Sequence, residues 1–342
     1  MNIYMYPISD PKKSNTNNPY INNLIGALEE ENCIVVNKNR IQRYGILDIL
    51  FNIRQVDVYY FNWIENLPDR RFGKIQCFLF YIIFLILKIF NKKIVWMMHN
   101  KISHSKKGLF CKIITTYFLV NYSDFVFTHA QDGVHFGNTF LKSNKQIHFF
   151  HHPIDNRLNL LQDKSFKKYD ILIWGSIIPY KGIDSFLKYL ENNALLTKFN
   201  ICIIGKVSNQ ELAKELDKYN SNNISIINDY ASQEYLEELF SQSKIVLFTY
   251  AGYSTLSSGA LMDTLSYGNR VIGPDIGVFR DLNKEGLVET YQGFDELSSL
   301  LDEFLTKNNF SSKYITKFIE HNLWQNLGKN ICNTIKDFQK VK

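Results

Sequence analysis

Residues 244–277 read KIVLFTYAGYSTLSSGALMDTLSYGNRVIGPDIG. The mostly apolar run at 244–249 predicts a buried strand, and the Gly- and Ser-rich segment after it predicts a loop. Residues 259–266 have a helical pattern, and residues 270–273 predict a second strand. A strand, a helix and a strand in this order are typical of a parallel sheet, so this stretch decides the fold class.

The loop in this stretch has the chemistry of an anion site. Ser257, Ser258 and Gly259 stand where the helix starts, so their backbone N–H groups have no partner within the helix. Small residues let a phosphate approach closely, and the helix dipole favours its charge. Asp263, about one turn further, can accept hydrogen bonds from a ribose diol. The alternative is a serine N-cap on an ordinary helix.

A second segment of this kind is GSIIPYKGID at 175–184. It follows a predicted strand at 170–174 and opens a predicted helix at 182–192. Gly175 allows a tight turn, and Lys181 stands near the helix N-terminus, where a cation beside free N–H groups suits a diphosphate. The alternative is a surface lysine in a turn.

Short apolar runs alternate with helical patterns along the whole chain, which predicts an α/β fold of two Rossmann-like domains facing a cleft. The length of 342 residues suits two domains. We expect an N-terminal domain at 1–153 and a C-terminal domain at 154–324, with a helix at about 325–342 packing back on the first. The other expected strands are 2–6, 33–36, 57–61, 93–98, 124–128, 147–151, 199–204 and 224–227, and the other expected helices are 20–31, 74–90, 110–121, 209–220, 232–241, 294–305 and 313–342.

The charge is uneven. Residues 1–150 hold 18 Lys and Arg against 10 Asp and Glu, and the rest of the chain holds 21 against 23. The basic first half therefore suits an anionic partner, such as phospholipid headgroups, a lipid diphosphate or nucleic acid. The charge excess is modest and no recognition motif stands out, which argues against nucleic acid. The five cysteines form no C-x-x-C pair and the N-terminus has no signal pattern, so we expect a cytoplasmic protein with free thiols.

The segment CFLFYIIFLIL at 77–87 is wholly apolar. With its continuation to Phe90 it is about 14 residues long, short of the roughly 20 that span a bilayer. Lysines 74, 88, 92 and 93 bracket it. Two interpretations stay open: a buried core helix, or a helix with one face in an anionic membrane surface.

Polar residues follow the predicted strands of the first half. His99 and Asn100 come directly after residues 93–98, with His104 in the next loop. A histidine at a strand end can orient or deprotonate an acceptor hydroxyl, and its alternative role is structural. His129 and Asp132, after the strand at 124–128, are weaker candidates of the same kind.

The second half resembles retaining glycosyltransferases of the family 4 type. The segments that carry the resemblance are GSIIPYKG at 175–182, IIGK at 203–206, DYASQEYLEELFSQSKIVLF at 229–248 and ALMDTLSYGNRVIGPDIG at 260–277. In the first half, NPYINNLIGAL and WMMHN resemble segments of bacterial polysaccharide glycosyltransferases. The resemblance implies the GT-B fold and a nucleotide-sugar donor.

Three positions depart from the family pattern. The phosphate-binding arginine falls at Ser176, the first motif glutamate at Thr255 and the second at Asp263. Arg280 is a candidate for the missing positive charge. From the patterns and the resemblance together we expect His99, Asn100 and Lys181 to be catalytic. The expected donor-binding residues are Ser176, Lys181, Tyr230, Tyr250, Thr255, Ser257, Ser258, Gly259, Asp263 and Arg280, and the expected acceptor-binding residues are Asn18, Tyr20, His104, His129 and Asp132.

We therefore expect a retaining hexosyltransferase that uses a UDP- or GDP-sugar and no metal or other cofactor. The expected acceptor is a lipid-linked oligosaccharide of capsule or O-antigen biosynthesis at the inner face of the cytoplasmic membrane, to which the protein would bind peripherally. Two alternatives stay open: a non-catalytic subunit that binds sugar nucleotides, and a UDP-sugar 2-epimerase of the same fold.

Overall fold

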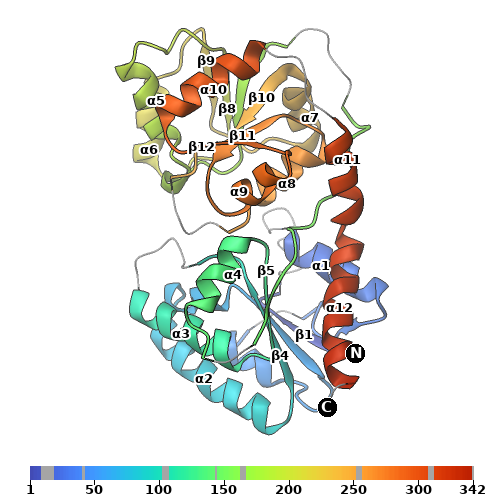
Figure 1. The fold of residues 1–342 in the computed structure, drawn as a ribbon. Helices are drawn as coiled ribbons and strands as arrows, with labels where there is room; N and C mark the ends of the chain where they lie inside the picture. Colours follow the sequence, from blue (N-terminus) through green and yellow to red (C-terminus); the bar gives the residue numbers. More distant parts are fainter. Residues whose placement is uncertain are drawn as a thin grey trace. The chain divides into compact units, whose positions relative to one another are not determined.

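The computed structural model describes residues 1–8, 19–40, 43–101, 108–142, 145–161, 167–251, 256–306 and 312–340. The chain divides into two compact units. The first contains Met1–Pro153, Ser254–Ser257 and Asn322–Lys342, and the second contains Ile154–Tyr253 and Ser258–His321. Each unit is built on one six-stranded sheet of parallel strands (Figure 1). The predicted α/β fold with two Rossmann-like halves is therefore confirmed.

The sheet of the first unit has the strand order β2-β1-β3-β4-β5-β6. Its strands are β1 (Asn2–Tyr6), β2 (Ile34–Val35), β3 (Val58–Asn62), β4 (Lys93–Met98), β5 (Phe125–Thr128) and β6 (Ile147–Phe149). Its helices are α1 (Tyr20–Glu30), α2 (Gly73–Ile89), α3 (Leu109–Tyr122), α4 (Gln131–Asn138) and α12 (Trp324–Lys340), with 3-10 segments η2 (Gly45–Leu50) and η3 (Ile64–Asp69).

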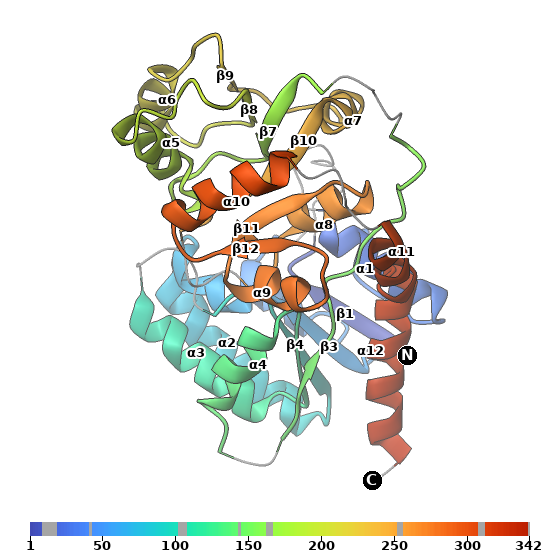
Figure 2. The same ribbon diagram turned by 45° about the horizontal axis from the view of Figure 1, so that its top comes forward.

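Alternate residues of β1 face two different cores, as the two-residue period of a strand requires. Tyr4 and Tyr6 pack into the core that α2 and α3 cover. Ile3 and Met5 pack into the core that α1 and α12 cover. The helices thus bury both faces of the sheet (Figure 2).

The sheet of the second unit has the order β12-β11-β10-β7-β8-β9. Its strands are β7 (Tyr169–Trp174), β8 (Ile201–Ile204), β9 (Ile224–Ile227), β10 (Ser243–Leu247), β11 (Val271–Pro274) and β12 (Glu289–Tyr291). Its helices are α5 (Ile183–Asn192), α6 (Gln210–Asp217), α7 (Gln233–Gln242), α8 (Gly259–Ser266), α9 (Gly277–Lys284), α10 (Phe294–Thr306) and α11 (Ser312–His321), with the 3-10 turn η4 (Pro179–Lys181).

The strand order of the second unit reverses between β7 and β10. The chain runs from β7 outward to β9 on one side and then from β10 outward to β12 on the other side. The loops that leave the carboxyl ends of β7 and β10 therefore start side by side and diverge. In open α/β sheets, ligands bind at this kind of reversal.

Some predicted boundaries are wrong. The strand expected at 244–249 ends at Leu247 as β10, because Thr249 turns its hydroxyl to the Lys181 carbonyl and Ala251 N–H bonds the Tyr180 carbonyl. The strand expected at 147–151 ends at Phe149. The tail helix expected at 313–342 is two helices, α11 and α12, which belong to different units.

The sequence pattern also did not predict α4, α9 and β12. The two helices have eight residues each and the strand has three. Elements this short have too few turns to show a clear period and depend on tertiary packing. Of the helices in the described ranges, none is long and apolar enough to cross a membrane.

Helix α12 packs on α1 within the first unit, as Figures 1 and 2 both show. The two helices meet closely at Gly328, where an added Cβ would lie 2.3 Å from the Ala27 carbonyl oxygen. Leu327 and Ile331 of α12 are buried beside this contact. A glycine at this position therefore sets the distance between the helices.

We predict that Gly328→Ala lowers the free energy of unfolding by about 1–3 kcal/mol, because the methyl group forces α12 away from α1. Urea unfolding followed by circular dichroism measures this change. Gly26→Ala is the matched control: Gly26 lies inside α1, and among the described residues outside this helix no atom lies within 4 Å of the added methyl group. The control should raise stability slightly through helix propensity, and an equal loss in both variants would contradict the close contact.

Candidate functional site

Lys181 is a buried cation at the strand reversal of the second unit. It ends η4, directly after the β7 loop, and only 8% of its surface is exposed. Its Nζ lies 5.5 Å from the centroid of the Tyr250 ring and faces the backbone of Gly175. In the described part of the chain no carboxylate forms an ion pair with it. Removal from water therefore lowers the pKa of Lys181 to about 8.

The loops after β7 and β10 contact each other closely beside Lys181. The Thr249 hydroxyl donates a hydrogen bond of 2.6 Å to the Lys181 carbonyl oxygen. Gly182 has a φ of +66°, and a Cβ there would lie 2.4 Å from the Thr249 carbonyl oxygen. The close approach of the two loops thus requires glycine at 182, and it fixes where the Lys181 side chain begins.

Helix α8 begins next to the same loops. The Ser258 Oγ accepts a hydrogen bond of 3.3 Å from the Leu261 N–H and lies 3.0 Å from the Tyr250 hydroxyl. The serine N-cap, which the sequence offered as the alternative to an anion site, is therefore present at Ser258. It occupies one N–H group, and helix geometry leaves the N–H groups of Gly259 and Ala260 without an intrahelical acceptor. Among the described residues outside α8 and the chain neighbours of Gly259, no atom lies within 4 Å of a Cβ built on Gly259, so these residues leave room for an anion at the backbone there.

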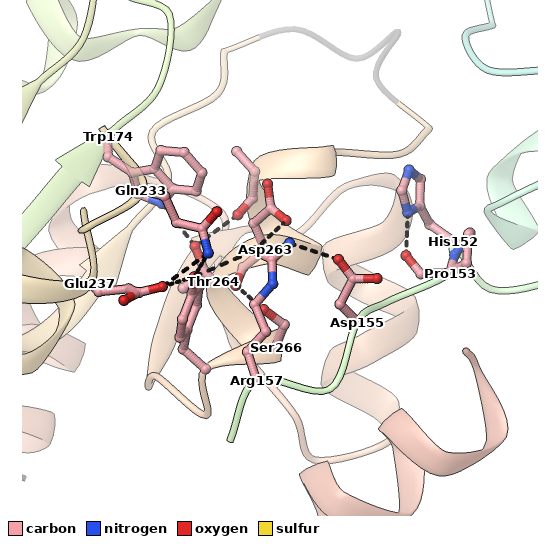
Figure 3. Close-up of polar contacts among 12 residues, drawn as sticks. His152, Pro153, Asp155, Arg157, Trp174, Gln233, Glu237, Asp263, Thr264 and Ser266 are labelled. Carbon is pink, nitrogen blue, oxygen red and sulfur yellow. Dashed lines mark hydrogen bonds and ion pairs between the residues drawn. The ribbon is translucent and has the colours of Figure 1, made fainter. Parts of the chain in front are cut away.

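Asp263 lies one turn into α8 and pairs with Arg157 (Figure 3). The Arg157 Nη1 is 3.5 Å from Asp263 Oδ1, and its Nη2 is 2.7 Å from Asp155 Oδ2. Burial raises the pKa of Asp263 to about 6; Arg157 opposes this effect and Asp155 adds to it. The Asp263 side chain keeps 42% of its surface exposed, so its carboxylate can still reach a ligand.

The sequence did not point to Arg157, which lies near the start of the predicted C-terminal domain at 154–324. The backbone N–H of Arg157 donates a hydrogen bond to the Ser266 carbonyl oxygen, and this contact places Arg157 beside α8. Nothing in the local pattern around residue 157 predicts this contact. Trp174 was missed in the same way: its indole N–H donates 2.8 Å to the Thr264 hydroxyl and holds α8 against the end of β7.

The structure therefore brings together Lys181, Tyr250, Ser258 and Gly259, with Asp263 one turn away. Ser176 and Tyr230 are exposed in the loops after β7 and β9. Arg280 on α9 forms an ion pair of 3.0 Å with Asp275, so its charge is partly balanced. Ser257 groups with the first unit, and Thr255 lies outside the described residues.

The first unit gathers three histidines at the carboxyl ends of neighbouring strands. His99 follows β4, His129 follows β5 and His152 comes shortly after β6. Their rings surround Tyr20, whose ring centroid is 4.7 Å from that of His99 and 5.6 Å from that of His129. Trp324 from α12 completes the group at 5.3 Å from Tyr20. Parallel strands that end at one edge explain how residues far apart in the sequence meet here.

The hydrogen bonds fix the tautomer of His129. Its Nδ1 lies 2.9 Å from the Phe150 carbonyl oxygen, which can only accept, so Nδ1 carries the proton. Its Nε2 therefore accepts the 2.7 Å hydrogen bond that the Tyr20 hydroxyl donates. The His152 Nδ1 likewise donates to the Pro153 carbonyl oxygen at 2.9 Å (Figure 3).

His99 contacts the Trp63 ring and the Asn62 amide, two residues that the sequence did not point to. Its imidazole stacks on Trp63 at 4.2 Å between centroids. Its Nε2 lies 2.9 Å from the Asn62 Oδ1. Both partners lie at the end of β3, the neighbouring strand, so only the sheet order could have identified them.

All three imidazoles are neutral at pH 7. Burial, strengthened by the neighbouring histidines, lowers the pKa of His129 to about 3 and that of His99 well below 6.5. Burial also lowers the pKa of His152 to about 4. Groups with such pKa values accept hydrogen bonds at neutral pH but are weak bases.

The remaining expected residues of the first half lie near this group or outside the described residues. Asn100 is partly buried directly after His99. Asp132, at the start of α4, forms an ion pair of 2.9 Å with Lys101. Asn18 and His104 lie outside the described residues. In the ranges that the structure describes, no three His, Cys, Asp or Glu side chains form a group that could hold a metal ion.

Residues 161–320, which lie in the second unit for almost their whole length, match the family model described as glycosyl transferases group 1. No curated protein matches the chain in sequence. Among solved structures, HepE from Anabaena in complex with UDP and glucose aligns over 98% of this chain and 100% of its own, with 13% identity and a TM-score of 0.70. The structure described as trehalose-6-phosphate from E. coli bound with UDP-2-fluoro glucose covers 98% and 99%, with 12% identity and a TM-score of 0.66. These likenesses establish the GT-B fold.

We predict that acid destabilises the first unit through its buried histidines. A folded-state pKa below the unfolded value of 6.5 means that the unfolded chain binds more protons, so the free energy of unfolding falls as the pH drops from 6.5 toward 4. The loss should reach about 2 kcal/mol per buried imidazole at pH 5. Urea unfolding at pH 5, 6 and 7.5 measures it. His129→Gln should flatten the slope and His321→Gln, on α11, should not; equal slopes in both would contradict the assignment.

Proposed function

We propose that this chain is a glycosyltransferase that moves a hexose from a UDP- or GDP-sugar to a lipid-linked or oligosaccharide acceptor in surface polysaccharide biosynthesis. The observation that carries the proposal is the buried Lys181, which lies beside the start of α8 at the strand reversal of a GT-B unit. None of the described carboxylates forms an ion pair with it. A buried charge of this kind is costly unless a ligand neutralises it. The group 1 domain match and the solved structures that hold UDP support the same class of ligand.

The leaving diphosphate is the natural counter-ion of Lys181. When the bond between the sugar and the diphosphate breaks, negative charge grows on the phosphate oxygens. The Lys181 ammonium group and the free N–H groups at the start of α8 would stabilise that charge in a site with little water. The proposed reaction therefore needs no bound metal, since the chain's own groups supply the positive charge.

Asp263 is the proposed ribose ligand. Its carboxylate lies on α8, one turn from the proposed phosphate position, and Arg157 orients it at 3.5 Å. The two hydroxyls of a ribose can each donate a hydrogen bond to a carboxylate. Such contacts fix the nucleoside but do not select the base, so they suit UDP- and GDP-sugars equally.

We propose that transfer retains the configuration of the sugar, with the acceptor proton passing to the leaving phosphate. The buried histidines of the first unit favour this route over a dedicated base. A pKa well below 6.5 makes His99 a poor proton acceptor at pH 7. Its proposed role, together with Asn100, is to orient the acceptor hydroxyl by hydrogen bonding.

A sugar-nucleotide-binding subunit without activity is the second candidate. The observation that favours it is Ser176, which is exposed after β7 where the resembling enzymes have a phosphate-binding arginine. Slow release of free sugar from a nucleotide sugar, with water as the acceptor, separates the two candidates. Hydrolysis that Lys181→Met abolishes supports the enzyme, and binding without any hydrolysis supports the subunit.

We predict that Lys181→Met weakens donor binding without weakening the fold. Burying the lysine costs on the order of 3 kcal/mol, so the variant should unfold at the same or a higher free energy. Loss of a charge-assisted hydrogen bond should weaken UDP- or GDP-sugar affinity by about 10–100-fold. Thermal unfolding with and without the nucleotide sugars measures both. Lys214→Met on α6 is the control, and equal binding by both variants would contradict the site.

We predict that donor affinity falls as the pH drops through about 6, because protonation of Asp263 removes an acceptor for the ribose hydroxyls. Titration calorimetry with an intact nucleotide sugar tests this between pH 5 and 8. The free nucleotide is unsuitable, because its terminal phosphate also titrates near pH 6. Asp263→Asn should show a flat profile; a profile that still bends near pH 6 would assign the titration to another group.

A further inference from the structure

The outer face of α2 exposes a continuous apolar stripe. Ile75, Phe78, Ile82, Leu85 and Ile89 each have between 41% and 80% of their surface exposed. They are spaced three, four, three and four residues apart, so they lie along one side of the helix. The stripe therefore runs nearly the full length of α2.

The opposite side of α2 is already used by the core. Cys77, Phe80, Phe84 and Leu87 are buried against the sheet of the first unit. A surface helix that packs its inner face on a core normally carries polar side chains on its outer face. In α2 both faces are apolar, so the outer face is not explained by the packing of this chain.

Helix α3 extends the apolar surface. It lies beside α2 in both Figure 1 and Figure 2, and the Tyr81 hydroxyl and the Thr115 Oγ1 are 2.8 Å apart across the seam. Its exposed apolar side chains are Leu109, Phe110, Ile113 and Ile114. Single exposed apolar residues are common, but a stripe joined to a second group is typical of an interaction surface.

Basic side chains outnumber acidic ones around this α2–α3 surface. The neighbouring Asp69 and Asp124 form ion pairs with Lys112 and Lys88. Neither residues 70–93 nor residues 108–122 contain an Asp or Glu. Arg71 and Lys74 are exposed at the start of α2, and Lys92 follows its end. An apolar face bordered by basic side chains complements a bilayer with anionic headgroups. The apolar residues would contact the acyl chains, and the basic side chains would pair with the headgroups.

We infer that the α2–α3 surface docks the protein onto an anionic lipid bilayer, with α2 lying in the plane of the interface. At 17 residues, α2 is roughly 25 Å long, which suits a helix that lies on the membrane and does not cross it. The inference deepens the proposed function and rests on it for purpose, since a lipid-linked acceptor is held in the same bilayer.

Flotation of the full chain with lipid vesicles tests the inference. The protein should float with vesicles of phosphatidylcholine and phosphatidylglycerol, and much less with phosphatidylcholine alone. Replacing two apolar contacts, in Phe78→Glu with Leu85→Glu, should lower the partition coefficient by roughly hundredfold or more. Leu160→Glu with Tyr314→Glu is the matched control, because it adds the same two charges at side chains that are 54% and 60% exposed. The replaced side chains are exposed, so circular dichroism should show unchanged folding.

A second double variant tests how much the basic side chains contribute to vesicle binding. Lys74→Gln with Lys92→Gln should lower binding to the anionic vesicles by about 30-fold, since each lysine near such a surface contributes about 1 kcal/mol. Lys329→Gln with Lys336→Gln, exposed on α12, is the control of equal charge and should bind like the unchanged chain. Equal losses in both double variants would show that net charge, and not this surface, drives binding.

Two results would overturn the inference. One is binding to anionic vesicles that the Phe78 and Leu85 substitutions leave unchanged. The other is a dimer in sedimentation experiments that these substitutions dissolve, since the face would then serve a second copy of the chain. Nucleotide-sugar binding in solution, measured on the same variants, separates this inference from the proposed function. Donor binding without vesicle binding refutes only the membrane surface, and vesicle binding without donor binding refutes only the proposed function.

Discussion

Lys181 keeps an ammonium group beneath the loops of the second unit with 8% of its surface exposed and no described carboxylate to balance it. Neighbouring residues fix the position of Lys181. Gly182 permits the two loops to meet, and the Thr249 hydroxyl bonds the Lys181 carbonyl. Because the charge is desolvated before any ligand arrives, an anion that enters the site gains more than it would from a lysine in water.

The first unit contributes the opposite chemistry. Its strand ends carry neutral rings, His99, His129 and His152, around the buried Tyr20. One unit is therefore built to neutralise negative charge, and the other to hold hydrogen-bonding groups uncharged at pH 7. The proposed glycosyl transfer would use both features, since the nucleoside diphosphate of the donor leaves as an anion and the acceptor arrives as a neutral hydroxyl. The apolar surface of α2 adds a third feature on the helices that cover one face of the first sheet.

The parts of the site that could be predicted from sequence are those set by local chain order. Ser258 and Gly259 start a helix after a strand, and Lys181 follows the tight turn at Gly175; both patterns lie within a few residues. Arg157 and Trp63 could not be predicted, because α8 and His99, which they contact, are distant in sequence. The break between α11 and α12 was missed for a similar reason: each helix belongs to a different unit, which the helical period does not show.

A crystal structure of the chain with UDP or GDP bound tests the account most directly. We expect the diphosphate within hydrogen-bonding distance of the Lys181 Nζ and of the N–H groups at the start of α8, with the ribose hydroxyls on the Asp263 carboxylate. Density for the nucleotide at another place, with Lys181 still buried and unpaired, would contradict it. So would the absence of either nucleotide from crystals grown at saturating concentrations.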